Sequence, residues 1–288
     1  MTQGGTWAST RWAANFDAYL AAFGGTMSSV SIHRYAETVC NHKTATLEGL
    51  LADRAAQGEA AGVAAWVGAA RQRGVPLYIG EGNSVSCGGA GGVSDVWAAA
   101  LWALDILFAM ASVGVQRWNF HGMPGGPYAV FNFPSAAAED VEVRPIFYGL
   151  LAFAGAAGRR AVLHNVTTLA TTNPLIKCWS VVDGDNITRV VLIHKDMNAT
   201  SNATVSVAPA RAPASGDDAV AVRGLPDPSR GVRSKWSDAI SWGGLSWAST
   251  SSGEPAGAPA AERIPLNAAG DAYILQLPPG SFAVITLP

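Results

Sequence analysis

Apolar runs of strand length alternate with helical periodicity from the start of the chain to about residue 158. Three strands are predicted, at 30–33, 77–79 and 115–120. A segment with helical spacing follows each strand, at 47–74, 94–114 and 143–157, and Ser94 is the predicted N-cap of the second helix. Repeated βα units form a parallel sheet covered by helices, so this part of the chain is expected to be α/β.

The pattern changes after about residue 160. Short β-rich runs separated by turn residues predict an antiparallel β-sandwich. These runs are 176–182, 187–194, 203–207, 273–277 and 282–287. Two segments rich in Ala, Pro, Ser and Gly, 208–228 and 248–261, are expected to be surface loops. We therefore predict two domains, an α/β domain over 1–160 and an all-β domain over 161–288.

The length of the first domain limits its architecture. A complete (β/α)8 barrel takes about 250 residues, whereas only about 160 residues and three βα units precede the predicted sandwich. The expected fold is therefore a partial (β/α)8 barrel, comprising about its last three units, followed by an antiparallel β-sandwich. On this prediction, the earlier units of the barrel are expected to be missing from the front of the sequence.

Composition and charge exclude several classes of protein. Hydrophobic residues make up 49% of the chain and charged residues 14%, so the chain can bury enough surface to fold. The net charge is −2 and the basic residues are scattered, so nucleic-acid binding is not expected. The run 96–115 approaches membrane length, but Asp105 in its middle would cost about 2.5–3.5 kcal/mol in lipid. No membrane span is expected.

Polar side chains stand at the ends of the three predicted strands. Glu81 closes the second strand, while His33 and His121 stand at the ends of the first and third. The carboxyl ends of parallel strands meet at one rim of the sheet, where α/β folds place their sites. Glu81 is therefore the leading catalytic candidate, with one histidine expected on each side. The alternative is a structural, salt-bridged glutamate with structural histidines.

Other common sites are disfavoured. The glycine-rich loop at 88–92 lacks the spacings of phosphate-binding loops, and neither a GxSxG elbow nor an HExxH motif occurs. The three cysteines, Cys40, Cys87 and Cys178, are too few and too far apart for a CxxC metal site. At most one disulfide can form, and whether Cys40 pairs with Cys87 is left open.

Four glycosylation acceptors are crowded into the predicted sandwich, at Asn165, Asn186, Asn198 and Asn202. Their use would require passage through a secretory pathway, although chance also explains such a cluster in Thr-rich segments. Residues 1–5 show no signal peptide. A secreted, extracellular or vacuolar location is expected if a signal precedes this sequence.

The stretch 31–133 resembles glycoside hydrolase family 79, which contains heparanase and β-glucuronidases. Five segments carry the resemblance: 31–35 (SIHRY), 44–47 (TATL), 77–95 (LYIGEGNSVSCGGAGGVSD), 118–122 (WNFHG) and 126–128 (GPY). The Gly-Glu pair followed by a glycine-rich loop and Ser-Asp is the most specific of them. Residues beyond about 170 resemble the small β-domain of that family.

The resemblance implies a retaining β-glycosidase of the β-glucuronidase type with Glu81 as its nucleophile. The implied substrate is a β-glucuronide or another uronic-acid glycoside, and neither a metal nor a cofactor is required. The implied substrate-binding residues are His33, Tyr35, Gly88, Gly89, His121 and Tyr128. In this scheme the backbone N–H groups of Gly88 and Gly89 and the hydroxyl of Tyr128 meet the sugar carboxylate.

One part of the implied machinery is missing. A retaining mechanism needs two carboxyl groups about 5–5.5 Å apart, and the family carries its acid/base in an Asn-Glu motif that occurs nowhere in this sequence. The first hypothesis is therefore the carboxyl-terminal portion of a family-79-like enzyme, weak or inactive by itself. The alternative is a non-catalytic carbohydrate-binding or cell-surface module derived from such an enzyme.

Overall fold

The computed structural model describes residues 2–8, 13–133, 141–158, 160–164, 168–209, 217–248, 250 and 252–288. The chain forms two compact units. Unit 1 comprises Met1–Ser94 and Asp105–Ala129, and unit 2 comprises Asp95–Leu104 and Val130–Pro288. Helix α4 (Ala98–Ser112) contributes its first half to unit 2 and its second half to unit 1. The domain boundary near residue 160 stays a prediction.

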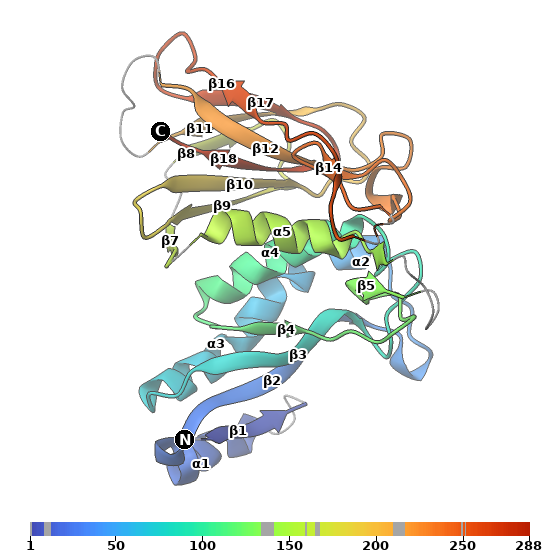
Figure 1. Ribbon diagram of the computed structural model, residues 1–288. Coiled ribbons are helices and arrows are strands. Elements are labelled where there is room, and N and C mark those ends of the chain that lie inside the picture. Colours follow the sequence, from blue (N-terminus) through green and yellow to red (C-terminus); the bar gives the residue numbers. More distant parts are fainter. Residues whose placement is uncertain are drawn as a thin grey trace. The chain divides into compact units, whose positions relative to one another are not determined.

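Unit 1 contains a parallel sheet of four strands in the order β1-β2-β3-β4 (Figure 1). The strands are β1 (Thr2–Trp7), β2 (Met27–Thr38), β3 (Leu77–Ser86) and β4 (Trp118–Phe120). The apolar pattern predicted β2, β3 and β4. It ended β3 at Ile79, just before Gly80 and Glu81, whereas the strand continues to Ser86.

Neither strand β1 nor helix α1 (Ala13–Phe23) was predicted. Strand β1 contains two glycines in six residues and has little intrinsic strand preference. Tertiary contacts hold β1 in place. It pairs with β2 along its length, and the Trp7 ring meets that of Phe16 edge-on with centroids 5.6 Å apart.

The helical segment predicted at 47–74 is divided. It contains α2 (Leu47–Leu51), a 3₁₀ turn (Asp53–Ala55) and α3 (Gln57–Gln72), which contacts β2 and β3. Thr46 caps α2 by accepting the Gly49 N–H at 3.0 Å. Gly74, with a φ of +68°, terminates the segment as predicted. Two further 3₁₀ turns lie at Gly24–Thr26 and Cys40–His42.

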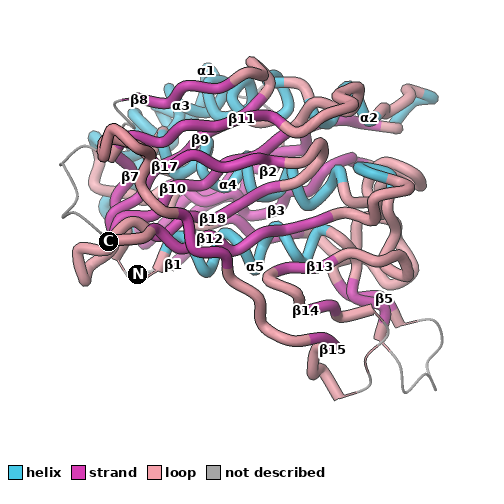
Figure 2. The backbone as a smooth tube through the Cα atoms, turned by 90° about the horizontal axis from the view of Figure 1, so that it is seen from above, coloured by secondary structure: helices cyan, strands magenta, loops and turns pink. Residues whose placement is uncertain are grey.

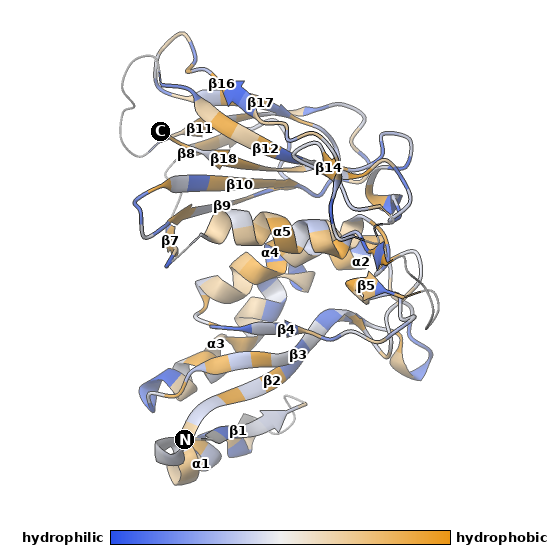
Figure 3. Cartoon of the chain, viewed as in Figure 1, coloured by the Kyte–Doolittle hydropathy of each residue, from blue (hydrophilic) through white to orange (hydrophobic). Residues whose placement is uncertain are grey.

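Helix α4 begins at Ala98, so the prediction that Ser94 caps it was wrong. The Ser94 hydroxyl is used elsewhere: it accepts the Ala90 N–H at 3.1 Å and the Ser84 hydroxyl proton at 2.9 Å. Figure 3 shows α4 and α5 (Ile146–Ala157) mostly in apolar colours. In the described part of the chain, no helix is both long enough and apolar enough to cross a membrane.

Unit 2 consists mainly of antiparallel strands. Its largest sheet has the order β15-β14-β13-β12-β18-β10-β9-β7, with β16 also paired to β12, and Figure 2 shows β13, β14 and β15 continuing from β12. A second sheet has the order β17-β11-β8, and β5 (Phe131–Asn132) pairs with β6 (Glu142–Val143). The remaining bounds are β7 (Val162–His164), β8 (Thr168–Thr171), β9 (Ile176–Val182), β10 (Thr188–His194), β11 (Ala203–Ala208), β12 (Ala219–Leu225), β13 (Ser241–Trp242), β14 (Leu245–Ser246), β15 (Ala256–Gly257), β16 (Glu262–Ile264), β17 (Tyr273–Leu277) and β18 (Phe282–Thr286).

The two larger sheets share an apolar core. Alternate residues of β11 and β17 are buried, and they pack in one cluster with residues of β9, β10, β12 and β18. Helix α5 contacts β9, β10, β12 and β13, and a 3₁₀ turn lies at Gly231–Arg233.

Strand β12 corrects the prediction of a surface loop over 208–228, because it pairs with β18 inside the largest sheet. Its Ala-Val-Ala-Val alternation is flanked by Pro- and Ala-rich segments, which hid it. Residues 210–216 of that predicted loop lie outside the described residues. The other predicted loop, 248–261, contains the short strand β15.

Candidate active site

A bulge in β3 turns Glu81 toward the polar face of the sheet. Ile32 pairs with Ile79, but the next residue of β2, His33, pairs with Glu81, so Gly80 is an extra residue. In a regular strand Glu81 would share a face with Ile79, which has no exposed surface. The extra residue instead places Glu81 on the same face as His33.

The Glu81 carboxylate accepts one strong hydrogen bond and stays open. The Tyr35 hydroxyl donates to Glu81 Oε1 at 2.7 Å, and His33 Nδ1 lies 3.6 Å from the same oxygen. The Glu81 side chain is 32% exposed. Its second oxygen, Oε2, has no hydrogen-bond partner among the described residues. One carboxylate oxygen is therefore fixed while the other is free to react.

Burial and the neighbouring carboxylate keep Tyr35 protonated. Desolvation is the largest cause that raises the pKa of Tyr35 far above its ordinary value, and the hydrogen bond to Glu81 and the charge of Glu81 add to it. The pKa of Tyr128 is also raised, mainly by burial and then by the charge of Glu81. Both phenols remain neutral hydrogen-bond donors at neutral pH.

His121 lies beside both phenols. Its Nδ1 atom is 2.7 Å from the Tyr128 hydroxyl oxygen and 3.3 Å from that of Tyr35. Tyr128 is 2% exposed, whereas His121 is half-buried. Of the two histidines expected on either side of Glu81, His33 lies next to the carboxylate. His121 contacts it only indirectly, through the Tyr35 hydroxyl.

Asn83 in β3 holds the backbone of His121 and Tyr128 next to this strand. It was not among the predicted site residues. The side chain has no exposed surface, and its amide donates to the carbonyl oxygens of His121 at 2.7 Å and Tyr128 at 3.0 Å. Its Oδ1 accepts the N–H of Ser84 at 2.7 Å. A buried amide needs several partners, but the burial of Asn83 is visible only in the structure, so the sequence offered no signal for it.

The glycine-rich loop is anchored at its start, next to Cys87. A disulfide joins Cys40 to Cys87, which settles the pairing that the sequence left open. Gly88 and Gly89 follow with φ angles of +98° and +90°, which only glycine adopts readily. A Cβ on Gly89 would lie 2.9 Å from the backbone nitrogen of Tyr128, so the loop packs closely against that residue.

The structure therefore places the seven predicted site residues in unit 1, where six of them share contacts and Gly88 is joined to them through Gly89. They are His33, Tyr35, Glu81, Gly88, Gly89, His121 and Tyr128. Cys178 lies in unit 2 as a free thiol, and burial raises its pKa to about 12. A thiol with so high a pKa is a poor nucleophile.

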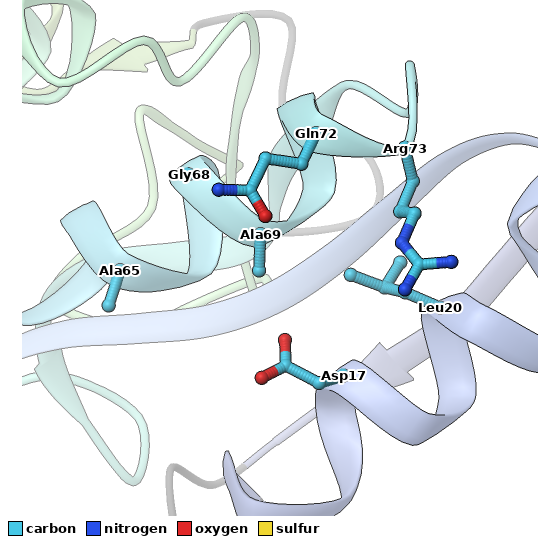
Figure 4. Close-up of a pocket in the computed structure, with 7 residues that line it drawn as sticks. All are labelled: Asp17, Leu20, Ala65, Gly68, Ala69, Gln72 and Arg73. Carbon is cyan, nitrogen blue, oxygen red and sulfur yellow. The ribbon is translucent and has the colours of Figure 1, made fainter.

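Two cavities lie outside this network. One of about 440 Å³ lies between α1 and the end of α3, and Figure 4 shows Asp17 and Arg73 on facing sides of it. The other, of about 480 Å³, lies in unit 2 and is lined largely by prolines and by Asp196 and Asp227. None of the predicted site residues lines either cavity.

Comparisons with known proteins show what the chain is similar to in sequence and in fold. No protein-family model matches the chain. A β-glucuronidase of Neurospora crassa is 27% identical over 144 residues, which cover 46% of this chain and 26% of that protein. The chain therefore spans about a quarter of the length of this curated relative.

Solved structures of glycosidases are similar to the chain in fold, and two of them are described here. A 4-O-α-L-rhamnosyl-β-D-glucuronidase from Fusarium oxysporum has a TM-score of 0.77 and 19% identity, over 99% of this chain and 59% of that one. A GH51 arabinofuranosidase from Xanthomonas axonopodis pv. citri has a TM-score of 0.64 and 15% identity, over 99% and 57%. The predicted likeness to β-glucuronidases and to the glycoside hydrolase fold is confirmed, and the finer assignment to family 79 stays a prediction.

Proposed function

We propose that this chain carries the nucleophile side of a retaining β-glucuronidase site of the family 79 type. One observation carries the proposal: the bulge at Gly80 turns the Glu81 carboxylate onto a polar face, where Tyr35 fixes one oxygen and leaves the other open. The similarity to a β-glucuronidase supports it. The four parallel strands of unit 1 would then form part of a (β/α)8 barrel.

In the proposed reaction, Glu81 Oε2 attacks the anomeric carbon of the uronide and forms an ester bond to it. The bond between that carbon and the leaving-group oxygen breaks, and an acid supplies the proton that this oxygen takes up. Water then hydrolyses the ester and restores the carboxylate. Tyr35 keeps the attacking group oriented throughout, because its hydroxyl holds Oε1 at 2.7 Å.

The acid/base carboxyl is proposed to come from a part of the enzyme outside this sequence. Among the described residues, Glu81 is the one carboxylate whose charge acts on both Tyr35 and Tyr128. Glu37, the nearest acidic residue in β2, is engaged in an ion pair with Arg54. Without a proton donor for the leaving group, the rate is expected to fall about 10²- to 10⁴-fold.

The proposed substrate class is a β-linked uronic acid. The backbone N–H groups of Gly88 and Gly89 have no hydrogen-bond partner among the described residues. A Cβ on Gly88 would have only Met123 Cε near it, at 3.6 Å, whereas Gly89 packs against Tyr128. Backbone N–H groups are neutral donors that bind a carboxylate well. They would meet the sugar carboxylate while Glu81 attacks the anomeric carbon.

A mechanism-based label tests the nucleophile assignment. The chain is incubated with a 2-deoxy-2-fluoro-β-glucuronyl fluoride, and the modified peptide is identified by mass spectrometry. Capture at Glu81, lost in Glu81→Gln, is the expected result. Capture at another residue with Glu81 unmodified overturns the assignment. Aryl β-glucuronides with good leaving groups are the preferred substrates, since their departure needs little protonation.

The second candidate function is a carbohydrate-binding module. It is favoured because Glu81 is the one carboxylate that acts on Tyr35 and Tyr128 among the described residues, whereas a retaining mechanism needs two. A module would bind D-glucuronate without forming a covalent adduct. Calorimetry with D-glucuronate beside the labelling experiment separates the two: binding with no adduct supports the module, and an adduct at Glu81 supports the enzyme.

We also propose that the protein matures in a secretory pathway. Asn186, Asn198 and Asn202 are exposed, while Asn165 lies outside the described residues. The disulfide between Cys40 and Cys87 is typical of proteins that fold in an oxidising compartment. Loss of mass on treatment with an N-glycosidase, for protein purified from its native source, is the expected result.

A further inference from the structure

A cavity of about 480 Å³ lies in unit 2, where three loops meet. The loops follow β10, follow β12 and connect β17 to β18. The volume falls within the range of about 300–1,000 Å³ that is typical of small-molecule sites. No lining residue takes part in the reaction proposed for Glu81, so a ligand bound in this cavity would be independent of that reaction.

Apolar residues form most of the cavity wall, and the loops that carry them are held in place. Pro226 and Val232 are buried, and a Cβ added to Gly280 would lie 2.8 Å from Val232 Cγ1. The loop between β17 and β18 therefore packs directly against the segment after β12. Trp97 fixes the same loop, because its Nε1 donates to the Gly280 carbonyl oxygen at 2.7 Å. Loops that are already ordered lose little freedom when a ligand enters.

Two aspartates bring negative charge to this apolar wall. Asp196 Oδ2 accepts a hydrogen bond from the Asn173 amide at 2.8 Å, and its Oδ1 accepts the N–H of Asn198 at 2.9 Å. Asp227 Oδ1 accepts the hydroxyl proton and the N–H of Ser229. Hydrogen bonds lower the pKa of both carboxyls, and the largest contributions come from the Asn173 amide and the Ser229 hydroxyl. Both aspartates are therefore ionised at neutral pH.

The two charges lack a counterion in the described part of the chain. Neither Asp196 nor Asp227 forms an ion pair with a described residue. The cationic side chain that acts on Asp227 is Arg230, which is itself paired with Asp238 at 3.3 Å. The basic group that acts on Asp196 is His194, whose Nδ1 donates to a backbone carbonyl at 2.9 Å. An apolar cavity with unpaired negative charge on its wall is complementary to an organic cation.

We propose that this cavity binds a free aliphatic ammonium ion, whose hydrocarbon body lies against the apolar wall while its N–H groups donate to the carboxylates of Asp196 and Asp227. Hydrogen bonds between ionised partners are about twice as strong as neutral ones. An anion would be repelled by both carboxylates. A metal ion would find few ligands on a mainly apolar wall, since Ca²⁺ takes about six to eight oxygens. The inference does not rest on the proposed function.

Met197 reports on ligand binding, because it lines the cavity. The full chain is labelled with ¹³C-methyl methionine, and Met197→Leu assigns the signal. Met110, which is 1% exposed in α4, is the internal reference. The probes are n-hexylammonium, 1-hexanol, hexanoate and calcium chloride. Hexylammonium should shift the Met197 signal with a dissociation constant of about 0.1–10 mM, and hexanol should bind about tenfold more weakly or worse. Hexanoate and calcium should have no effect.

The ligand series decides the inference on the wild-type chain alone. An affinity for hexanol equal to or above that for hexylammonium overturns it, and so does a Met197 signal that no probe shifts or that calcium or hexanoate shifts in a saturable way. Raising the salt concentration should weaken the binding of hexylammonium and leave that of hexanol unchanged, because salt screens charges.

Three substitutions test the position of the ligand. Asp196→Asn and Asp227→Asn should each weaken hexylammonium binding about threefold to tenfold and leave hexanol binding unchanged, as expected for loss of one charged partner. Asp185→Asn, in the exposed turn between β9 and β10, is the matched control and should bind as the wild type does. Equal losses for hexanol and hexylammonium in the cavity variants overturn the role of the charges. Ala199→Leu narrows the cavity and should weaken both ligands, and unchanged binding in this variant would place the ligand elsewhere.

Discussion

A Cβ atom added to Gly80 would lie 2.6 Å from the hydroxyl oxygen of Ser31. Ser31 cannot easily move, because its residue has no exposed surface and its hydroxyl already bonds Thr6 Oγ1 at 2.8 Å. The bulge that directs Glu81 therefore depends on a residue without a side chain. On the other side of Glu81, a Cβ on Gly82 would lie 2.6 Å from the carbonyl oxygen of Arg34.

Gly80→Ala is expected to lower the free energy of unfolding by about 1–3 kcal/mol, since the neighbouring backbone must shift to admit the methyl group. Urea denaturation measures this change. Gly68→Ala in α3 is the matched control, because no atom lies within 4 Å of its added Cβ. That control should be neutral or stabilising by up to about 1 kcal/mol. Equal stability of the two variants would contradict the packing argument.

Removing the disulfide should destabilise unit 1. Cys40 and Cys87 are separated by 47 residues, and closing a loop of that length in the unfolded chain is worth about 4 kcal/mol in the chain-entropy model. The double variant Cys40→Ser/Cys87→Ser is expected to unfold at a lower urea concentration than the wild type. A reducing agent should lower the wild-type midpoint and leave that of the variant unchanged. If the reducing agent also lowered the urea midpoint of the variant, the loss of stability would not come from the Cys40–Cys87 disulfide.

Tyr35→Phe should slow covalent labelling of Glu81 by about tenfold to a hundredfold, because the nucleophile loses the hydroxyl that orients it. The rate of adduct formation by mass spectrometry is the measurement. Tyr78→Phe is the matched control, because it removes a phenol hydroxyl from β3, the strand that carries Glu81, at a residue that does not contact Glu81. Its labelling rate should match that of the wild type. An unchanged rate in Tyr35→Phe would refute the orienting role.

Alkaline pH should destabilise the fold. Burial is the largest cause that raises the pKa of Tyr35, Tyr128, Tyr148 and Tyr273 above the ordinary value of 10.0. The folded chain keeps these protons while the unfolded chain releases them, so their contribution is complete below about pH 10 and is lost as the pH rises further. Urea midpoints between about pH 8 and about pH 11 should fall, and Tyr35→Phe should reduce the slope. A flat profile would contradict the raised pKa values.

The sequence was informative where local chemistry and tertiary structure agree. Apolar runs located β2 and β3, Gly74 located the end of α3, and the residues at the strand ends indicated that His33 lies beside Glu81. These signals are strong because a buried parallel strand must be apolar and a helix end needs a special residue.

The remaining features depend on contacts between distant segments. Strand β1 is held by β2 and by the packing of Trp7, and β12 is held by its neighbours in the sheet, so neither has a strong local pattern. The bulge at Gly80 is a matter of register, which only pairing with β2 reveals. Asn83 acts on carbonyl groups 38 and 45 residues away, and no spacing rule anticipates such a bond.

The bridge between Cys40 and Cys87 also bears on how the protein should be produced. Bacterial cytosol keeps thiols reduced, so material made there would carry two unpaired cysteines next to the glycine loop and could be mistaken for an inert protein. Expression in a periplasm or a yeast secretory route, followed by thiol counting, would yield the oxidised form, in which the disulfide fixes Cys87 at the start of the glycine-rich loop.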